Sequence, residues 1–220
     1  IMNNVFMSMK KKDFFSFRIM CDYLGTCVDD IPVQLQSMTV SGQFGYALMM
    51  SFMGGLVIGF PFIFYQIWGF LKPGLKFGEK KMAKGIVFYV SFLFFLGILF
   101  GYFVVAPLSI QFFGSYQISS EIRNDFTISS YMSMILSTVF YTGIFFLLPV
   151  VTYLLTKIGV LSPEFLIKYR KHAIVGILIL SAIITPPDII SQVIVSIPIF
   201  ILYEIGILIA KRVVKTSKDE

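Results

Sequence analysis

Two carboxylates stand out among the residues that could do chemistry in this chain of 220 residues, of which only 14% are charged. Glu204 lies within the apolar run Ile-Leu-Tyr-Glu-Ile-Gly-Ile, and an acid inside such a run is a candidate functional group. The alternatives are that its side chain reaches the aqueous interface or pairs with a neighbouring helix. The amides of Gln66 and Gln192 also lie in apolar runs, where amides often link helices.

The second carboxylate, Glu79, is the sole acid in residues 71–84, which also hold five lysines. One interpretation is that it offsets the neighbouring positive charge, a weak effect at a surface. The other is that it binds an arginine of a ligand through two parallel hydrogen bonds, which lysine cannot form. The sequence leaves both interpretations open.

Few side chains of this chain carry a thiol or an imidazole group. The chain has one histidine and two cysteines, whereas a zinc site usually draws three or four such ligands from the chain, so we expect no metal site and no cofactor. The common nucleophile, zinc and phosphate-binding motifs are absent, which argues against an enzyme. Cys21 and Cys27 either form a disulfide or stay as thiols.

The composition of the chain indicates the environment in which these residues lie. Hydrophobic residues make up 57% of the chain and mean hydropathy is +0.85, which excludes an ordinary soluble domain. The net charge of +6 is confined to short clusters between apolar runs, so it fits lipid head groups rather than nucleic acid. The sequence therefore predicts an all-α polytopic membrane protein.

Five apolar runs are long enough, or nearly long enough, to be transmembrane helices: about 44–70, 85–110, 131–156, 165–185 and 189–210. Residues 1–42 are predicted as an extracytoplasmic segment, 43–212 as the membrane domain and 213–220 as a cytoplasmic tail. Pro61 should kink the first span. The last two spans should be short and joined by a turn at Pro186, Pro187 and Asp188, and Ser162 should cap the helix that begins at Pro163.

The positive charges predict the orientation. Thirteen Lys and Arg residues fall in 71–84, 157–171 and the tail from 211, all on one side of the five-span arrangement. Because such residues gather in cytoplasmic loops, that side is predicted to be cytoplasmic. An outward segment holding Lys10, Lys11, Lys12 and Arg18 then predicts that a further helix precedes it. The pairs Gly55/Gly59 and Gly97/Gly101 are expected to pack helices inside the molecule rather than between subunits.

Four blocks of residues, in order, are similar to one known family. They are 61–75 with 79–81, then 95–107, then 143–150, and finally 169–173 with 185–188, 191–192, 198 and 203–206. Together they resemble the TatC family, the C subunits of the twin-arginine translocase, over about residues 42–212.

The resemblance implies six helices with both termini cytoplasmic, five of them visible here. It implies a receptor and scaffold in the bacterial inner membrane that binds twin-arginine signal peptides. Such a protein assembles with itself and with the single-span subunits TatA and TatB, and exports folded proteins using the proton-motive force. It also implies roles for residues: signal-peptide binding by Glu79, Gln66 and Leu75, and a framework or partner-docking role for Pro61, Pro186, Pro187, Asp188, Gln192 and Glu204.

Two departures from the family are expected to matter. The family's acidic N-terminal segment is not seen, and Leu147 stands where many members carry an intramembrane Glu or Gln. Two other classes of protein fit the sequence less well. A small secondary transporter or channel would need more intramembrane acids than Glu204, and an intramembrane enzyme would need a second catalytic partner, whereas His172 lies among lysines.

Overall fold

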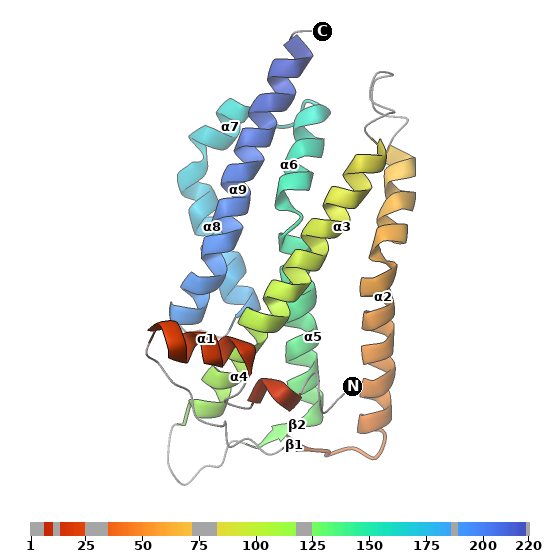
Figure 1. Ribbon diagram of the computed structural model, residues 1–220, viewed down its shortest axis with the longest axis vertical. Coiled ribbons are helices and arrows are strands. Elements are labelled where there is room, and N and C mark those ends of the chain that lie inside the picture. The colour runs from red at the N-terminus through yellow and green to blue at the C-terminus, as the bar shows by residue number, and fades with distance from the viewer. Residues whose placement is uncertain are drawn as a thin grey trace.

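The computed structural model describes residues 7–10, 14–24, 35–71, 83–117, 125–185 and 189–218. These residues form a helical bundle in which the long helices run roughly along the long axis (Figure 1). The first helices are η2 (Met7–Lys10), α1 (Phe15–Leu24), α2 (Gly42–Leu71) and α3 (Ala83–Phe100). The protein is thus an all-α polytopic membrane protein, as predicted.

The second predicted span changes its helix type in the middle. Helix α3 continues into a π-helical turn, η5 (Gly101–Val105), and then into α4 (Ala106–Ser115). The backbone N–H of Ala106 donates to Gly101 O, five residues earlier. Pro107 explains the wider turn, because it has no N–H and its ring crowds the preceding turn. The 31 residues Gly85–Ser115 still form one apolar span.

A proline also interrupts the third predicted span. Helix α5 (Ile128–Phe145) ends in a turn, and α6 (Leu148–Lys157) begins just before Pro149. Leu147, at the position that departs from the family pattern, occupies the N-cap position of α6 without a side-chain capping hydrogen bond. Gly159, with φ of 79°, turns the chain after α6.

The last helices differ from the prediction in length. Ser162 caps α7 (Pro163–Lys168) by accepting a hydrogen bond from Phe165 N at 3.2 Å, as predicted. The helix then breaks at Tyr169 and restarts as α8 (Arg170–Ile184), whose 15 residues span about 22 Å. Helix α9 (Ile189–Lys218) has 30 residues, so the expectation that it is short was wrong.

Among the described residues, four helical stretches are long and apolar enough to cross a membrane. They are Gly42–Phe70, Gly85–Ser115, Ile128–Lys157 and Ser191–Val214. The predicted span at 165–185 is not among them, because the break at Tyr169 leaves α8 shorter than a bilayer core of about 30 Å. The turn that joins α8 to α9 at Pro186, Pro187 and Asp188 lies outside the described residues.

Glycines bring α3 and α5 close together. A Cβ on Gly97 would lie 2.8 Å from Phe146 Cβ and 2.9 Å from Gly143 Cα, and one on Gly101 would lie 2.9 Å from Val139 Cα. The predicted internal packing is therefore correct for Gly97 and Gly101. It is wrong for the other pair within the described residues, because a Cβ on Gly55 would meet nothing within 4 Å.

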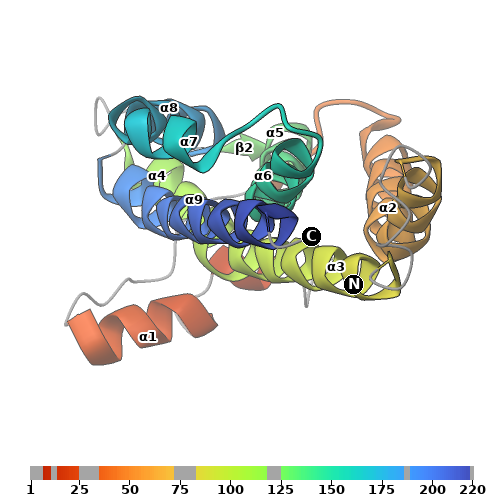
Figure 2. The same ribbon diagram turned by 90° about the horizontal axis from the view of Figure 1, so that it is seen from above.

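Helix α2 stands at the edge of the bundle, joined to it mainly through α3 (Figures 1 and 2). The rings of Phe60 and Phe94 stack with centroids 3.8 Å apart, and Trp68 is buried. Pro61 lies inside this continuous helix. Most of the α2 surface is thus left to the surroundings.

The N-terminal residues pack across one end of the bundle, opposite the C-terminus (Figure 1). Met9, Phe14 and Phe17 are buried against α4 and α5. Nearby, β1 (Leu35–Gln36) and β2 (Phe126–Thr127) pair in parallel, and the Tyr46 hydroxyl bonds to that of Ser129. This end of the membrane domain is therefore covered by protein.

Candidate functional site

Glu204 forms an ion pair where α7, α8 and α9 meet. Nη2 of Arg170, the first residue of α8, donates to Glu204 Oε2 at 2.7 Å. The two side chains are 45% and 31% exposed, so the carboxylate lies at the edge of the bundle and not in its interior. The sequence left several alternatives open for Glu204. In the structure its side chain pairs with a neighbouring helix.

A second bond closes the same junction. The hydroxyl of Tyr203 donates to Leu166 O of α7 at 2.8 Å. Adjacent residues of α9 therefore hold the last turn of α7 and the first residue of α8, on either side of the break at Tyr169. This fixes the short helices against α9, and it makes Glu204 a group already bound to a cation.

Gln192 links the two arms of the helical hairpin at the other end. Its Nε2 donates to Leu178 O at 3.0 Å, crossing from α9 to α8. The buried hydroxyls of Ser181 and Thr185 bond to carbonyls of their own helix, at Ile177 and Ser181. These three polar side chains are thus satisfied within the hairpin, as an apolar solvent requires.

Each helix of the hairpin carries an exposed apolar stripe. Exposed side chains recur every four residues on both helices, which places them in stripes along one face of each. They are Val175, Ile179 and Ile183 on α8, and Ile189, Val193, Ile197 and Ile201 on α9. The hairpin therefore offers a surface on which further membrane helices can pack.

The predicted signal-peptide residues belong to a different part of the molecule. Gln66 is exposed on the last third of α2, beside Tyr65, which is 60% exposed. Leu75 and Glu79 lie outside the described residues, in the segment 72–82 that joins α2 to α3. Cys27 also lies outside them; Cys21 is bonded as a disulfide, and the pairing of the two stays a prediction.

The structure brings Gln192 and Glu204 together on one hairpin and places Pro61 and Gln66 on α2, beyond α3 (Figure 2). Sequence reasoning missed the partners of these groups. The sequence indicated Arg170 only as one of the basic residues of 157–171, and Tyr203 was not singled out as a donor. A usable signal was that Arg170 and Glu204 both lie near the same predicted end of adjacent predicted helices.

Comparison with known proteins gives one consistent family. The sequence profile of the family described as Sec-independent protein translocase protein (TatC) matches residues 2–198. The TatC protein of Blattabacterium sp. subsp. Periplaneta americana is 45% identical over 183 residues, covering 83% of this chain and 69% of that protein. TatC of Helicobacter pylori (strain J99) is 37% identical over 208 residues, covering 94% and 80%.

A solved structure agrees with the sequence comparison. The crystal structure of the twin arginine translocase receptor TatC in DDM superposes with a TM-score of 0.69 and 33% sequence identity. The superposition covers 93% of this chain and 85% of that one. The likeness thus extends over nearly the whole described fold.

Proposed function

The chain belongs to the TatC family of Sec-independent protein translocase proteins, and from this premise we propose that it is the receptor and scaffold subunit of the twin-arginine translocase. It is a multi-pass membrane protein with a role in protein transport. In the proposal it recognises signal peptides with paired arginines and helps to export folded proteins using the proton-motive force. The observation that carries the proposal is the family match over residues 2–198.

Signal-peptide recognition is assigned to the end of the molecule that holds the segment between α2 and α3. Glu79 accepts the arginine pair, because a carboxylate can bind a guanidinium through two hydrogen bonds. The five lysines around it repel any cationic peptide, and only a peptide with arginine can offset this through the forked contact. Leu75 and the exposed Gln66 contribute the rest of the surface, which is consistent with the position of Gln66 on the accessible side of α2.

The single-span subunits TatA and TatB dock on the α8–α9 hairpin. The exposed apolar stripes on its two helices supply packing area. The proposal assigns the angle between the helices to Pro186, Pro187 and Asp188, because prolines cannot continue a helix. Gln192 and Glu204 hold the two arms in register through Leu178 and Arg170. Small-residue positions such as Gly55 and Gly59, open on α2, favour contact with a second copy of the chain.

The proposed location is the bacterial inner membrane, with the C-terminus in the cytoplasm, because the lysine-rich and arginine-rich loops then face inward. A transporter or channel is less favoured. Glu204, the acid that such a role would use, is already paired with Arg170 at the edge of the bundle.

Export in cells tests the function as a whole. The full chain is expressed in a bacterium that lacks its own TatC, together with its TatA and TatB, and a folded reporter carrying a twin-arginine signal is followed to the periplasm. We expect export of that reporter and none of a reporter whose two arginines are replaced by lysines. Export of both reporters at equal rates, or of neither, would count against the proposal.

A further inference from the structure

Two buried polar side chains lie in the contact between α2 and α3. Trp68, the one tryptophan of the sequence, is 4% exposed, and Ser91 is 9% exposed. Within the described residues, neither the indole N–H of Trp68 nor the hydroxyl of Ser91 has a hydrogen-bond partner. A buried polar group without a partner is costly, so most such groups in folded proteins bind another protein group or an ordered water.

Both side chains belong to the helix faces that meet in this contact. The rings of Phe60 and Phe94 stack there with their centroids 3.8 Å apart. The ring of Trp68 stacks on that of Phe64, one turn before it on α2, with the centroids 6.4 Å apart. Since Phe64 follows Phe60 by one turn, these three rings form one face of α2. Ser91 precedes Phe94 by three positions and so lies on the same side of α3.

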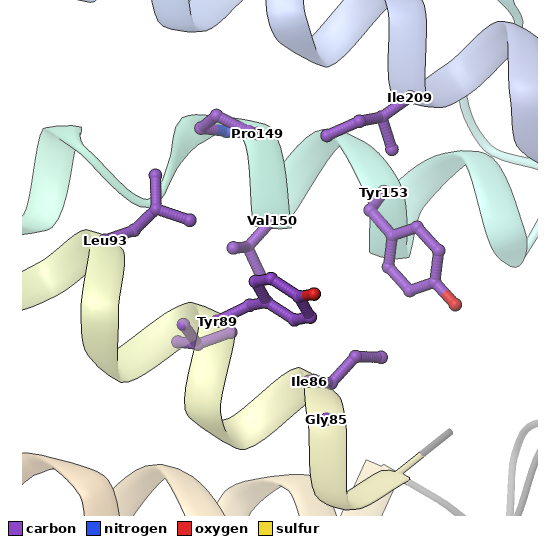
Figure 3. Close-up of a pocket in the computed structure, with 9 residues that line it drawn as sticks. Gly85, Ile86, Tyr89, Leu93, Pro149, Val150, Tyr153 and Ile209 are labelled. Carbon is purple, nitrogen blue, oxygen red and sulfur yellow. The ribbon is translucent and has the colours of Figure 1, made fainter. Parts of the chain in front are cut away.

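The opposite side of α3 confirms the direction of Ser91. A pocket between α3, α6 and α9 is lined by Tyr89 and Leu93, whose side chains point from α3 toward α6, away from α2 (Figure 3). Ser91 lies two positions from each of them, and residues two apart on a helix lie on nearly opposite sides. The side chain of Ser91 is therefore directed toward α2.

The two side chains also lean toward each other along the helix axes. Helices α2 and α3 run in opposite directions, and α2 ends where α3 begins (Figure 1). Measured from the Phe60–Phe94 stack toward that end, the Cα of Trp68 is about 12 Å away and the Cα of Ser91 about 4.5 Å away. A helical side chain is directed toward the N-terminus of its own helix. Trp68 is thus directed back toward the level of Ser91, and Ser91 forward toward that of Trp68.

We propose that Trp68 and Ser91 hold one water molecule between α2 and α3, and that this water fixes the end of α2 for signal-peptide binding. The water oxygen accepts a hydrogen bond from the indole N–H, and the hydroxyl supplies the second of the about two to four polar partners that a buried water needs. Both protein atoms are enclosed, which suits a ligand as small as water. The positioning role rests on the proposed function, because α2 ends at Leu71 and the chain continues there toward Leu75 and Glu79.

The indole N–H allows a direct test of the water, because a chain with one tryptophan gives a single indole signal in a nitrogen–proton NMR spectrum. The full chain, labelled on the indole nitrogen, is placed in lipid nanodiscs. We expect magnetisation transfer between the indole proton and water. Ser91→Ala should move the indole signal upfield, because the water loses one of its partners and its hydrogen bond to the indole weakens.

Ser51→Ala is the matched control for the spectrum. Ser51 is exposed on α2 and donates to Ala47 O of its own helix at 2.9 Å, so its loss should leave the indole signal where it is. Absence of transfer to water in the unaltered chain overturns the water site. An indole signal that stays in place in Ser91→Ala, or that moves as far in Ser51→Ala, also overturns it.

Peptide titration in the same nanodiscs tests the positioning role. Trp68→Phe keeps an aromatic ring and removes the N–H, whereas Ser91→Ala removes only the hydroxyl. We expect each change to weaken binding of a twin-arginine peptide by about 2- to 10-fold, the equivalent of one hydrogen bond. The double variant should weaken binding no more than either single one, because both changes remove the same water. Ser51→Ala should bind as the unaltered chain does.

The outcomes separate this inference from the proposed function. Unchanged affinity in both single variants, or additive losses in the double variant, overturns the positioning role whatever the indole spectrum shows. If the unaltered chain binds no twin-arginine peptide, the proposed function fails and the positioning role fails with it. The indole spectrum decides the water site in either case, since it is recorded without peptide.

Discussion

At the residue scale, three polar side chains of the α8–α9 hairpin donate to other groups of the protein. Arg170 holds Glu204, Tyr203 holds Leu166 O, and Gln192 holds Leu178 O. Hydrogen bonds of this kind fix the positions of the helices. Breaking one would leave its donor and acceptor unpaired in an apolar solvent. These bonds fix the hairpin as a unit, and its exposed apolar side chains form the surface on which partner helices are proposed to dock.

The Arg170–Glu204 pair should contribute modestly to stability. Both side chains are partly exposed, so we expect Arg170→Gln and Glu204→Gln each to cost at most about 1 kcal/mol, or roughly 2 to 4 °C in Tm. The double variant should cost no more than either single one. Thermal unfolding in detergent measures this, with the exposed Lys171→Gln as control. Additive losses in the double variant would show that the two side chains act separately.

Glu79 gives a sharper prediction, since its two interpretations differ in outcome. If it accepts a forked arginine pair, Glu79→Gln should weaken binding of a twin-arginine peptide by about 2 to 3 kcal/mol, or about 30- to 150-fold. Binding of a twin-lysine peptide should change little. Peptide titration of the full chain in nanodiscs at fixed salt measures both. Equal losses for the two peptides would reduce Glu79 to a general charge effect.

At the element scale, prolines and glycines decide how the helices are divided and packed. The apolar runs predicted the helices, but similar prolines have different effects: Pro61 and Pro198 lie inside continuous helices, Pro107 follows a π-helical turn, and Pro149 follows a break. A proline has no N–H, so one carbonyl of the preceding turn loses its helical donor. That carbonyl can be satisfied in several ways, and the neighbouring helices decide which. Sequence alone therefore located the third span and missed its interruption at Leu147.

The end of α9 was missed for a related reason. The predicted boundary at residue 210 follows the apolar run, which stops before Lys211. The helix continues to Lys218 because lysine and arginine are good helix formers once the chain is in water. The Arg170–Glu204 contact joins residues 34 apart in the sequence, and only the angle of the hairpin brings them together.

The contact between α3 and α5 should be intolerant of even one methyl group. Gly97→Ala places a Cβ within 3 Å of Gly143 Cα, so we expect a loss of about 1 to 3 kcal/mol and a Tm lower by about 2 to 12 °C. Gly55→Ala is the matched control, because a Cβ there meets nothing within 4 Å. Thermal unfolding of both variants checks this. Equal stability of the two would contradict the packing described.

At the scale of the whole molecule, charge should fix the orientation. The helix ends that flank the basic loops meet at the C-terminal end of the bundle. The N-terminal residues cover the other end (Figure 1). We therefore expect the C-terminal end in the cytoplasm. With Cys21 and Cys27 replaced by serine, a cysteine at Lys80 should resist an impermeant label added from outside. One at Ser119 should react. The reverse labelling pattern would show that the molecule has the opposite orientation in the membrane.

The central claim is that this chain is a receptor for paired arginines, and a peptide titration tests it most directly. The unaltered full chain in lipid nanodiscs is titrated at one salt concentration with a twin-arginine signal peptide and with the same peptide carrying two lysines. Salt is held fixed because it screens the surrounding lysines. The account predicts that the arginine peptide binds at least about 30-fold more tightly. Equal affinities for the two peptides would contradict it.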